Sequence, residues 1–288
     1  MTLETYINFL GATGKKAIPD DGYIWCYINW GFYQSFPVHR PIHPPRARIS
    51  KILWETPAVG LRYGTDNHTG SGRSSFVYVC KKGEYTMNRL SANNRSKVRR
   101  GLKLCHIAPI TNAEYFRKQG WALNAETLQR QGRLERKAKQ KWEKLTNCLG
   151  RFEGMEVWGA WVNEALASFV LTFQIDGCVN LLTFRSSKEH LRFYPNNALI
   201  HTVVSEMLGR DNVEIVSFGE ESLQELTSLD AFKIGMGFQK QPIVQKIVLH
   251  PAVGWVFNRL TRQIVQNIAH HCPHSTFWKK AAGVTELL

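Results

Sequence analysis

The sequence predicts an α/β (α+β) protein with a mixed, mostly antiparallel sheet flanked by helices. Two observations within residues 156–250 lead to this prediction. Three short apolar runs follow one another with tight turns between them, and Asp176-Gly177 is a typical hairpin turn because both of its central positions favour positive φ. After Pro195 the apolar residues change to helical spacing, and strands and helices then alternate.

The expected order over this stretch is strand, strand, strand, helix, strand, helix, strand. The first three strands form an antiparallel meander, with Asn163-Glu164 as its first turn. The first helix has apolar residues at helical spacing up to Leu208, and Gly209 is placed to end it. The expected strands are 156–162, 166–174, 179–185, 213–218 and 243–249, and the second helix is 223–232.

Short motifs accompany this order: Tyr194–Ile200 opens the first helix, Ser217–Gly219 ends a strand, and Leu229–Lys233 precedes Gly235–Phe238. With these motifs the chain resembles the acyl-CoA N-acyltransferase (GNAT) superfamily, and more closely its branch of Fem-type aminoacyl transferases and FemAB-like proteins. The basic run Asn94–Lys103 is a weaker similarity. Fem-type proteins contain two copies of the fold, so the resemblance implies that the first 110 residues are a diverged copy.

We therefore expect four consecutive segments. They are an N-terminal α/β half (1–110), a basic helical arm (111–150), a GNAT-like catalytic core (151–250) and a C-terminal helical tail (251–288). Strands are expected in the first half at 23–30, 49–54 and 76–80, and helices in the arm at 113–130 and 133–145. We do not expect the stretch 39–46 to be helical, because each proline favours extended geometry in the residue before it.

Positive charge is concentrated between Lys81 and Lys144, where 17 lysines and arginines face five acidic residues and account for +12 of the chain's +14. Such a concentration indicates a polyanionic partner such as tRNA, anionic lipid or a phosphorylated donor. The alternative is a basic face that is simply solvated. The candidate contacts are Arg95, Lys97, Arg99, Arg100, Lys103, Arg133, Arg136 and Lys137.

Composition excludes several classes of protein. No apolar run approaches the roughly 20 residues of a membrane-spanning helix, and the first residues lack a secretory signal. The six cysteines are scattered without a C-x-x-C pair, which favours a reducing cytoplasm over a disulfide framework or cysteine zinc site. Residues 270–274 include metal-ligating types at a poor zinc spacing, so no metal is expected. The amphipathic stripe over 251–268 indicates core packing or a peripheral membrane contact.

Acyl transfer onto an amine requires a bound donor, a group that accepts the amine's proton and donors for the developing oxyanion. The resemblance places the donor where two central strands splay, beside the helix that starts at Pro195, and a helix N-terminus suits phosphate. The glycine-rich loop of acetyl-CoA enzymes is absent there, which weakens CoA binding and fits the FemAB-like branch. The candidate donor-binding residues are Arg185, Asn196, Asn197 and Lys233.

Each candidate also has a simpler interpretation. Lys233 matches a recurrent lysine of FemAB-like proteins, which implies a phosphate contact, although a surface lysine on a short helix is the alternative. Arg185 ends the third strand, where it would meet phosphate or carboxylate. Glu220 follows a strand end near the expected cleft and is a candidate base, or else it caps the next helix. His190 and Tyr194 are the other candidate catalytic residues, on a loop that borders the site.

These observations predict an N-acyltransferase or aminoacyltransferase (EC 2.3 type) that moves an acyl or aminoacyl group onto an amine acceptor and forms an amide. The expected co-substrate is aminoacyl-tRNA or a CoA or carrier-protein thioester, with no tightly bound cofactor. The alternative is a non-catalytic RNA-binding protein with a GNAT-like fold. The residues leave the identity of the acceptor amine open.

Overall fold

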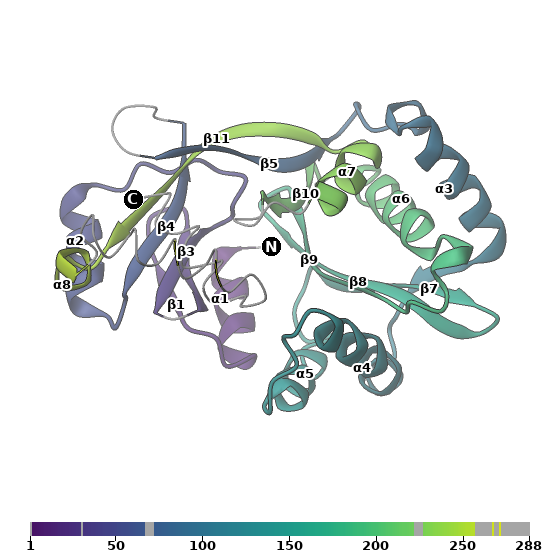
Figure 1. Ribbon diagram of the computed structural model, residues 1–288, viewed down its shortest axis with the longest axis horizontal. Coiled ribbons are helices and arrows are strands. Elements are labelled where there is room, and N and C mark those ends of the chain that lie inside the picture. Colours follow the sequence, from purple (N-terminus) through teal and green to yellow (C-terminus); the bar gives the residue numbers. More distant parts are fainter. Residues whose placement is uncertain are drawn as a thin grey trace. The chain divides into compact units, whose positions relative to one another are not determined.

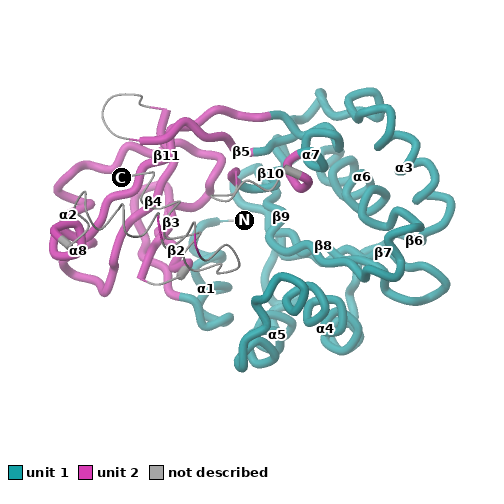
Figure 2. Tube along the Cα trace, viewed as in Figure 1, with its two compact units in different colours: residues 1–15, 78–219, 231–239 teal, residues 16–77, 220–230, 240–288 magenta. Residues whose placement is uncertain are grey.

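The computed structural model describes residues 2–29, 31–66, 72–221 and 227–256, together with the single positions 267 and 271. Over these residues it contains eleven strands, mostly antiparallel, and eight α-helices (Figure 1). The chain separates into two compact units, which Figure 2 distinguishes by colour. Unit 1 comprises residues 1–15, 78–219 and 231–239, and unit 2 comprises 16–77, 220–230 and 240–288. Each unit is thus assembled from three separate stretches of chain.

The predicted meander is confirmed in unit 1. Strands β7 (Met155–Val162), β8 (Ala165–Ile175) and β9 (Cys178–Ser186) pair antiparallel in sequence order. Both predicted turns have two left-handed residues, with φ of 47° and 68° at 163–164 and of 46° and 76° at 176–177. This is the backbone that a two-residue hairpin turn requires. A short strand, β6 (His106–Pro109), adds to β7 at the outer edge.

The elements after the meander also follow the predicted order. Helix α6 (Pro195–Leu208) ends at Gly209, as expected, and β10 (Ile215–Glu220) then pairs in parallel with β9. Helix α7 (Thr227–Gly235) contains residues 227–232 of the expected helix 223–232, and residues 223–226 lie outside the described residues. The last strand, β11 (Gln239–Leu249), begins four residues before the expected one.

Helices cover both faces of the meander (Figure 1). On one face α6 packs with α3 (Ala92–Leu104), which follows the short turn η1 (Met87–Arg89). On the other face lie α4 (Ala113–Arg130) and α5 (Ala138–Thr146), and the rings of Phe116 and Trp142 approach Phe169 of β8 at 5.0 and 5.7 Å. The predicted basic arm is therefore an integral layer of unit 1. Helix α1 (Leu3–Ala12) also belongs to unit 1 and packs Tyr6 and Phe9 on Phe173.

The second predicted helix of this basic region begins five residues later than expected. Gly132 follows α4 with a left-handed φ of 63°, and residues 133–137 then form the connection to α5. This connection carries no periodic apolar residue, so the high content of helix-forming lysine and arginine gave a misleading signal there.

Unit 2 repeats the order of elements seen in unit 1. Strands β1 (Ala17–Pro19), β2 (Ile24–Asn29) and β3 (Phe32–Phe36) pair antiparallel, helix α2 (Arg46–Glu55) follows, and β4 (Gly60–Thr65) pairs in parallel with β3. Strand β11 then pairs antiparallel with β4. In both units, three antiparallel strands are followed by a helix and by a strand parallel to the third. This repetition supports two related halves, although no repeat is visible in the sequence.

One predicted strand in unit 2 is wrong. Residues 49–54 lie in α2, where Ile49, Ile52 and Leu53 have helical spacing and pack into the core with Leu61 and Tyr63 of β4. Other predicted strands are confirmed, since β2 covers most of 23–30, and β5 (Arg73–Lys81) contains 76–80. The tail begins with the short helix α8 (Pro251–Val256).

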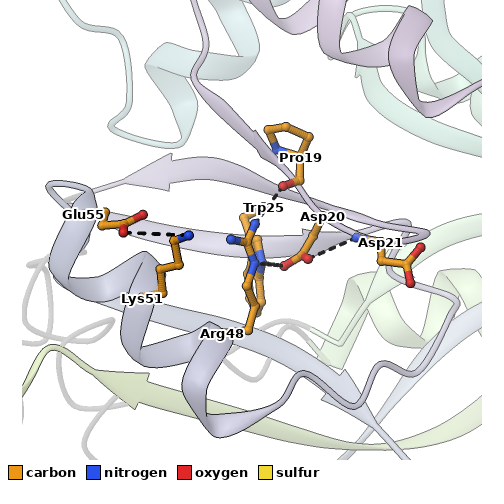
Figure 3. Close-up of polar contacts among 7 residues, drawn as sticks. All are labelled: Pro19, Asp20, Asp21, Trp25, Arg48, Lys51 and Glu55. Carbon is orange, nitrogen blue, oxygen red and sulfur yellow. Dashed lines mark hydrogen bonds and ion pairs between the residues drawn. The ribbon is translucent and has the colours of Figure 1, made fainter.

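A polar cluster joins α2 to the end of β1 (Figure 3). The carboxylate of Asp20 accepts hydrogen bonds from Trp25 Nε1 at 3.1 Å and from Arg48 Nε at 3.0 Å, and its side chain is 11% exposed. Burial by itself raises the pKa of Asp20, but the hydrogen bonds from Trp25 and Arg48 outweigh it, so the pKa is lowered. Asp20 therefore remains ionised and holds α2 on the sheet.

Candidate active site

The parallel pairing of β10 with β9 is short. It runs from Ile215 opposite Cys178 to Ser217 opposite Asn180, whereas β9 continues to Ser186. The two central strands of unit 1 thus diverge beyond Asn180, which is the splay that the family resemblance implies. Phe184 of β9 and Phe218 of β10 meet edge to face, with ring centroids 6.3 Å apart, where the strands have separated.

The start of α6 is held in place by α3. Tyr194 precedes the helix in a left-handed conformation (φ 60°, ψ 38°) and makes no side-chain capping hydrogen bond. Its carbonyl packs against Gly101 of α3, where an added Cβ would stand 2.7 Å from the carbonyl oxygen. Its ring lies 5.0 Å from the guanidinium of Arg100, whose Nη1 donates to the Tyr194 hydroxyl at 3.4 Å. The start of the helix is therefore in close contact with α3 and lacks a side-chain cap, so its first N–H groups are not used by a capping side chain and can bind an anion.

The two asparagines at the start of α6 have different environments. Asn197 is buried, and its Nδ2 donates to Oδ1 of Asn94 in α3 at 3.0 Å and contacts Sδ of Met236 at 3.4 Å. Asn197 thus connects α6, α3 and the segment after α7. Asn196 donates to Ser186 Oγ at 3.3 Å, while its buried Oδ1 accepts no hydrogen bond from the described residues. Asn196 therefore has a buried acceptor atom without a partner among the described residues, whereas the amide nitrogen of Asn197 is used in contacts with Asn94 and Met236.

Lys233 is enclosed by aromatic rings. Its side chain is 4% exposed, and the ammonium lies 4.2 Å from the ring centroid of Tyr78 and 5.4 Å from that of Phe218. A cation over aromatic faces is attracted by the ring quadrupole. The interpretation of Lys233 as a surface lysine is therefore wrong. Because Phe218 also borders the splay of the strands, Lys233 belongs to the same neighbourhood of unit 1.

Arg185 faces the opposite side of the sheet from the start of α6. Its Nε donates to Oδ1 of Asn124 in α4 at 2.9 Å, and its Nη1 donates to the Phe184 carbonyl at 2.9 Å. Neighbouring residues of a strand point to opposite faces, so Ser186 faces α6 while Arg185 faces α4. Burial lowers the pKa of Arg185, and the positive charge of Arg133 lowers it further. The structure thus places Arg185 apart from the two asparagines.

The loop candidates for catalysis lie just before α6. His190 precedes the short turn η2 (Leu191–Phe193), and its buried Nδ1 has no hydrogen-bond partner among the described residues. Tyr194 contributes its carbonyl and ring to the contacts with α3. Tyr194 therefore has a structural role that the sequence did not predict, whereas His190 retains a free ring nitrogen.

Glu220 lies in unit 2, whereas the other predicted catalytic and donor-binding residues lie in unit 1. Its Oε2 accepts hydrogen bonds from Arg62 Nη2 of β4 at 2.6 Å and from Gln245 Nε2 of β11 at 3.0 Å. Its Oε1 is buried and has no partner among the described residues. Sequence reasoning missed Arg62 and Gln245. The available signal was an arginine between two glycines within a strand, Gly60-Leu61-Arg62-Tyr63-Gly64.

The predicted polyanion-binding residues do not form one surface. Arg95, Lys97, Arg99, Arg100 and Lys103 lie on α3, and Arg133, Arg136 and Lys137 lie in the connection between α4 and α5. These two groups lie on opposite faces of the meander (Figure 1). Arg95 donates to the Leu90 and Asn88 carbonyls, so its charge also has a structural role. An RNA bound to one face would contact only part of the concentrated charge.

The predictions for the tail fall mostly outside the described residues. Of the stripe 251–268, the structure describes residues 251–256 and 267, with Trp255 strongly exposed. Of residues 270–274, it describes only His271. Across the described part of the chain, no helix is long and apolar enough to span a membrane, and no three potential metal ligands cluster.

Comparison with known proteins identifies the fold. No protein-family model matches the sequence, and no curated protein matches it. The structure of FemX superposes with a TM-score of 0.59, at 13% identity over 88% of this chain and 93% of FemX. L-PGS from Bacillus licheniformis gives a TM-score of 0.55, at 12% identity over 86% of this chain and 91% of L-PGS.

The chain has the fold of FemX and L-PGS. A conserved protein of unknown function from Bacteroides thetaiotaomicron is also similar, with a TM-score of 0.55 at 11% identity over 83% of this chain and 87% of that protein. The expected similarity to Fem-type proteins is thereby confirmed for the fold. At these identities, the residues of the site must be assessed by their own geometry.

Proposed function

We propose that this protein is an N-acyltransferase that moves an acyl or aminoacyl group from an activated donor onto an amine. The observation that carries the proposal is the arrangement in unit 1 around the diverging strands β9 and β10. Two features border the strand ends there. One is the uncapped N-terminus of α6, with Asn196 Oδ1, which has no partner among the described residues. The other is the ammonium of Lys233, which is enclosed by aromatic rings. The shared fold with FemX and L-PGS, both aminoacyltransferases, adds support.

The proposed donor site uses the start of α6 and Lys233. The N–H groups of the first helical turn and the lysine ammonium are suited to the phosphates of a nucleotide-linked donor or to the oxyanion that forms during transfer. Enclosure by aromatic rings removes water from the ammonium, which strengthens its electrostatic effect on a bound anion. Lys233 and Asn196 are thus the proposed donor-binding residues, and Asn197 maintains the shape of the site.

The proposed base is His190, a predicted catalytic residue of unit 1 whose buried Nδ1 has no hydrogen-bond partner among the described residues. In the reaction the amine nitrogen attacks the carbonyl carbon of the donor and loses a proton to Nδ1. The new C–N bond forms as the C–O bond of an aminoacyl ester, or the C–S bond of a thioester, breaks. The proton then passes to the leaving oxygen or sulfur.

The donor class is tested by offering the protein both kinds of donor, aminoacyl-tRNA and acyl thioesters. Purified protein is incubated with charged tRNA, uncharged tRNA and a panel of CoA thioesters at two salt concentrations. Binding is followed by thermal shift, and transfer to an added amine by mass spectrometry. Salt-sensitive binding of charged tRNA with transfer of its amino acid supports an aminoacyl-tRNA donor, because neutralised phosphates release counterions. Stabilisation and transfer with a thioester alone support the thioester donor.

The control for catalysis is Lys233→Met, which keeps a long apolar side chain between the rings. The enzymatic proposal would be refuted if the protein binds RNA but transfers no group to any amine, and if Lys233→Met binds RNA as well as wild type does. That result would favour the non-catalytic RNA-binding alternative.

A further inference from the structure

Arg185 is a partly buried arginine without an acidic partner. Its guanidinium donates from Nε to Asn124 Oδ1 at 2.9 Å and from Nη1 to the Phe184 carbonyl at 2.9 Å. Neither acceptor is charged, and Arg185 forms no ion pair with a carboxylate of the described residues. A partly buried charge is costly unless an opposite charge compensates it. The arrangement therefore indicates that an anionic ligand supplies the missing charge.

Three other partly buried arginines of the described chain each form an ion pair with a carboxylate. These pairs are Arg48–Asp20, Arg62–Glu220 and Arg210–Glu156. Arg185 instead has a second cation nearby. Besides burial, the positive charge of Arg133, in the connection between α4 and α5, lowers the pKa of Arg185. Two neighbouring guanidiniums without a carboxylate partner among the described residues are suited to an oxyanion, because the planar donors of arginine match carboxylate and phosphate groups.

The Arg185 guanidinium is held in place but is not enclosed. Its hydrogen bonds to Asn124 of α4 and to Phe184 of β9 fix it to both elements. Glu126 of α4 forms no ion pair with it, and the Oε1 of Glu126 accepts from the backbone N–H of Lys188 at 2.9 Å. Nη2 of Arg185 makes no hydrogen bond to the described residues and is not a buried atom, so solvent reaches it. A ligand can therefore accept from both N–H groups of Nη2 without displacing a contact.

This anion site adjoins the proposed donor site across a single strand. Ser186, the next residue of β9, faces α6 and accepts a hydrogen bond from Asn196 Nδ2 at 3.3 Å, whereas Arg185 faces α4. The Cα atoms of consecutive residues are about 3.8 Å apart, and β9 ends at Ser186. Both sites therefore lie at the same strand end of unit 1, on opposite faces. A donor phosphate bound at the start of α6 leaves Arg185 free for a second ligand.

We propose that Arg185, assisted by Arg133, binds a carboxylate or phosphate group of the amine acceptor. The assignment of this anion to the acceptor rests on the proposed function, whereas the anion site itself does not. The reactive amine must lie several bonds from the anion, because it has to reach a donor on the other face of β9. An ω-amino acid has this arrangement. A simple alkylamine lacks the anion.

The test measures the binding of three probes of similar size to the full chain. The probe 6-aminohexanoate has both the carboxylate and the amine, hexanoate has only the carboxylate, and hexylamine has only the amine. Affinities are measured by calorimetry, and contact with the site by the NMR signal of the Arg185 Nε–H group in ¹⁵N-labelled protein. We expect both carboxylates to shift this signal and to bind about tenfold more tightly than hexylamine, since one charge-assisted hydrogen bond has about that effect on affinity.

The two kinds of oxyanion are distinguished with the smallest probes. Acetate and inorganic phosphate are titrated separately against the Arg185 signal. A shift at lower concentrations of acetate identifies a carboxylate-bearing acceptor, and a shift at lower concentrations of phosphate identifies a phosphorylated one.

Two variants separate the site from the general attraction of anions to a basic protein. Arg185→Gln removes the guanidinium and assigns its NMR signal, and 6-aminohexanoate should lose its advantage over hexylamine in this variant. The matched control is Arg117→Gln, because Arg117 of α4 also donates to an asparagine, Asn147 Oδ1, at 2.8 Å. It removes the same charge and should leave the advantage unchanged. If Arg185→Gln does not fold, the ranking of the three probes in wild type still decides the question.

Equal affinities for 6-aminohexanoate and hexylamine, an Arg185 signal that no anion moves, or equal losses in Arg185→Gln and Arg117→Gln would overturn the inference. Transfer assays with the two amines as acceptors distinguish the two proposals. Transfer to both amines with the same KM, independent of Arg185, would retain the proposed function and reject the acceptor site. Binding of carboxylates that depends on Arg185, without transfer from any donor, would retain the anion site and reject the proposed function.

Discussion

Replacing Gly101 by alanine tests whether α3 determines the position of the α6 N-terminus. A Cβ at this position would stand 2.7 Å from the Tyr194 carbonyl oxygen and 3.0 Å from Ala198 Cβ, so either α3 or the start of α6 must move. Alanine gains about 1 kcal/mol over glycine in a helix interior. Overpacking costs about 1–3 kcal/mol, and the upper part of that range applies because a backbone atom is in the way. We expect Gly101→Ala to lower the free energy of unfolding by about 1–2 kcal/mol.

The matched control is Gly11→Ala in α1, where an added Cβ would meet nothing within 4 Å. This variant should be as stable as wild type or gain up to about 1 kcal/mol. Because two units need not unfold in one step, hydrogen exchange of the α3 and α6 amides should accompany urea unfolding. Gly101→Ala should speed exchange at the start of α6. If Gly101→Ala is as stable as Gly11→Ala, the close contact between α3 and Tyr194 does not determine the position of the helix.

Three further predictions concern charge. The lowered pKa of Asp20 means that its stabilising effect is complete above the unfolded pKa of about 3.9 and is lost as the pH falls through the folded pKa. The difference in urea midpoint between wild type and Asp20→Asn should therefore be constant above about pH 5 and shrink toward pH 3, and a constant difference would contradict this. Lys233→Met should lower kcat/KM about 100-fold or more. The control Lys240→Met changes an exposed lysine and should leave kcat/KM unchanged. Equal effects of the two substitutions would refute the role of Lys233 in binding the donor. The basic residues lie on two faces of the meander, so tRNA bound to one face depends mainly on the charges of that face. Neutralising two residues on the binding face should reduce the salt dependence of tRNA binding more than neutralising two residues on the other face. Equal effects would contradict binding to one face. The paired variants are Arg99→Ala/Lys103→Ala and Arg136→Ala/Lys137→Ala.

Local sequence patterns were sufficient to predict the secondary structure of a segment where that structure depends on the segment's own residues. The hairpin turns at 163–164 and 176–177 and the helix from Pro195 to Leu208 were predicted because turn chemistry, proline geometry and apolar spacing act over a few residues. The error at 49–54 has a local cause as well. Its apolar residues have helical spacing, but isoleucine and tryptophan also favour strands, and the pattern is too short to separate the two.

The sequence by itself determined the order of elements in unit 1, the resemblance to FemAB-like proteins and the concentration of basic residues. Only the tertiary structure decided what surrounds each polar group. It enclosed Lys233 between Tyr78 and Phe218, turned Arg185 away from the start of α6, and paired Glu220 with Arg62. Arg62 and Glu220 are 158 positions apart in the chain, and no local pattern encodes which strands bring them together. Secondary structure follows from interactions among near neighbours, whereas a binding site depends on contacts between residues that only the folded sheet makes adjacent.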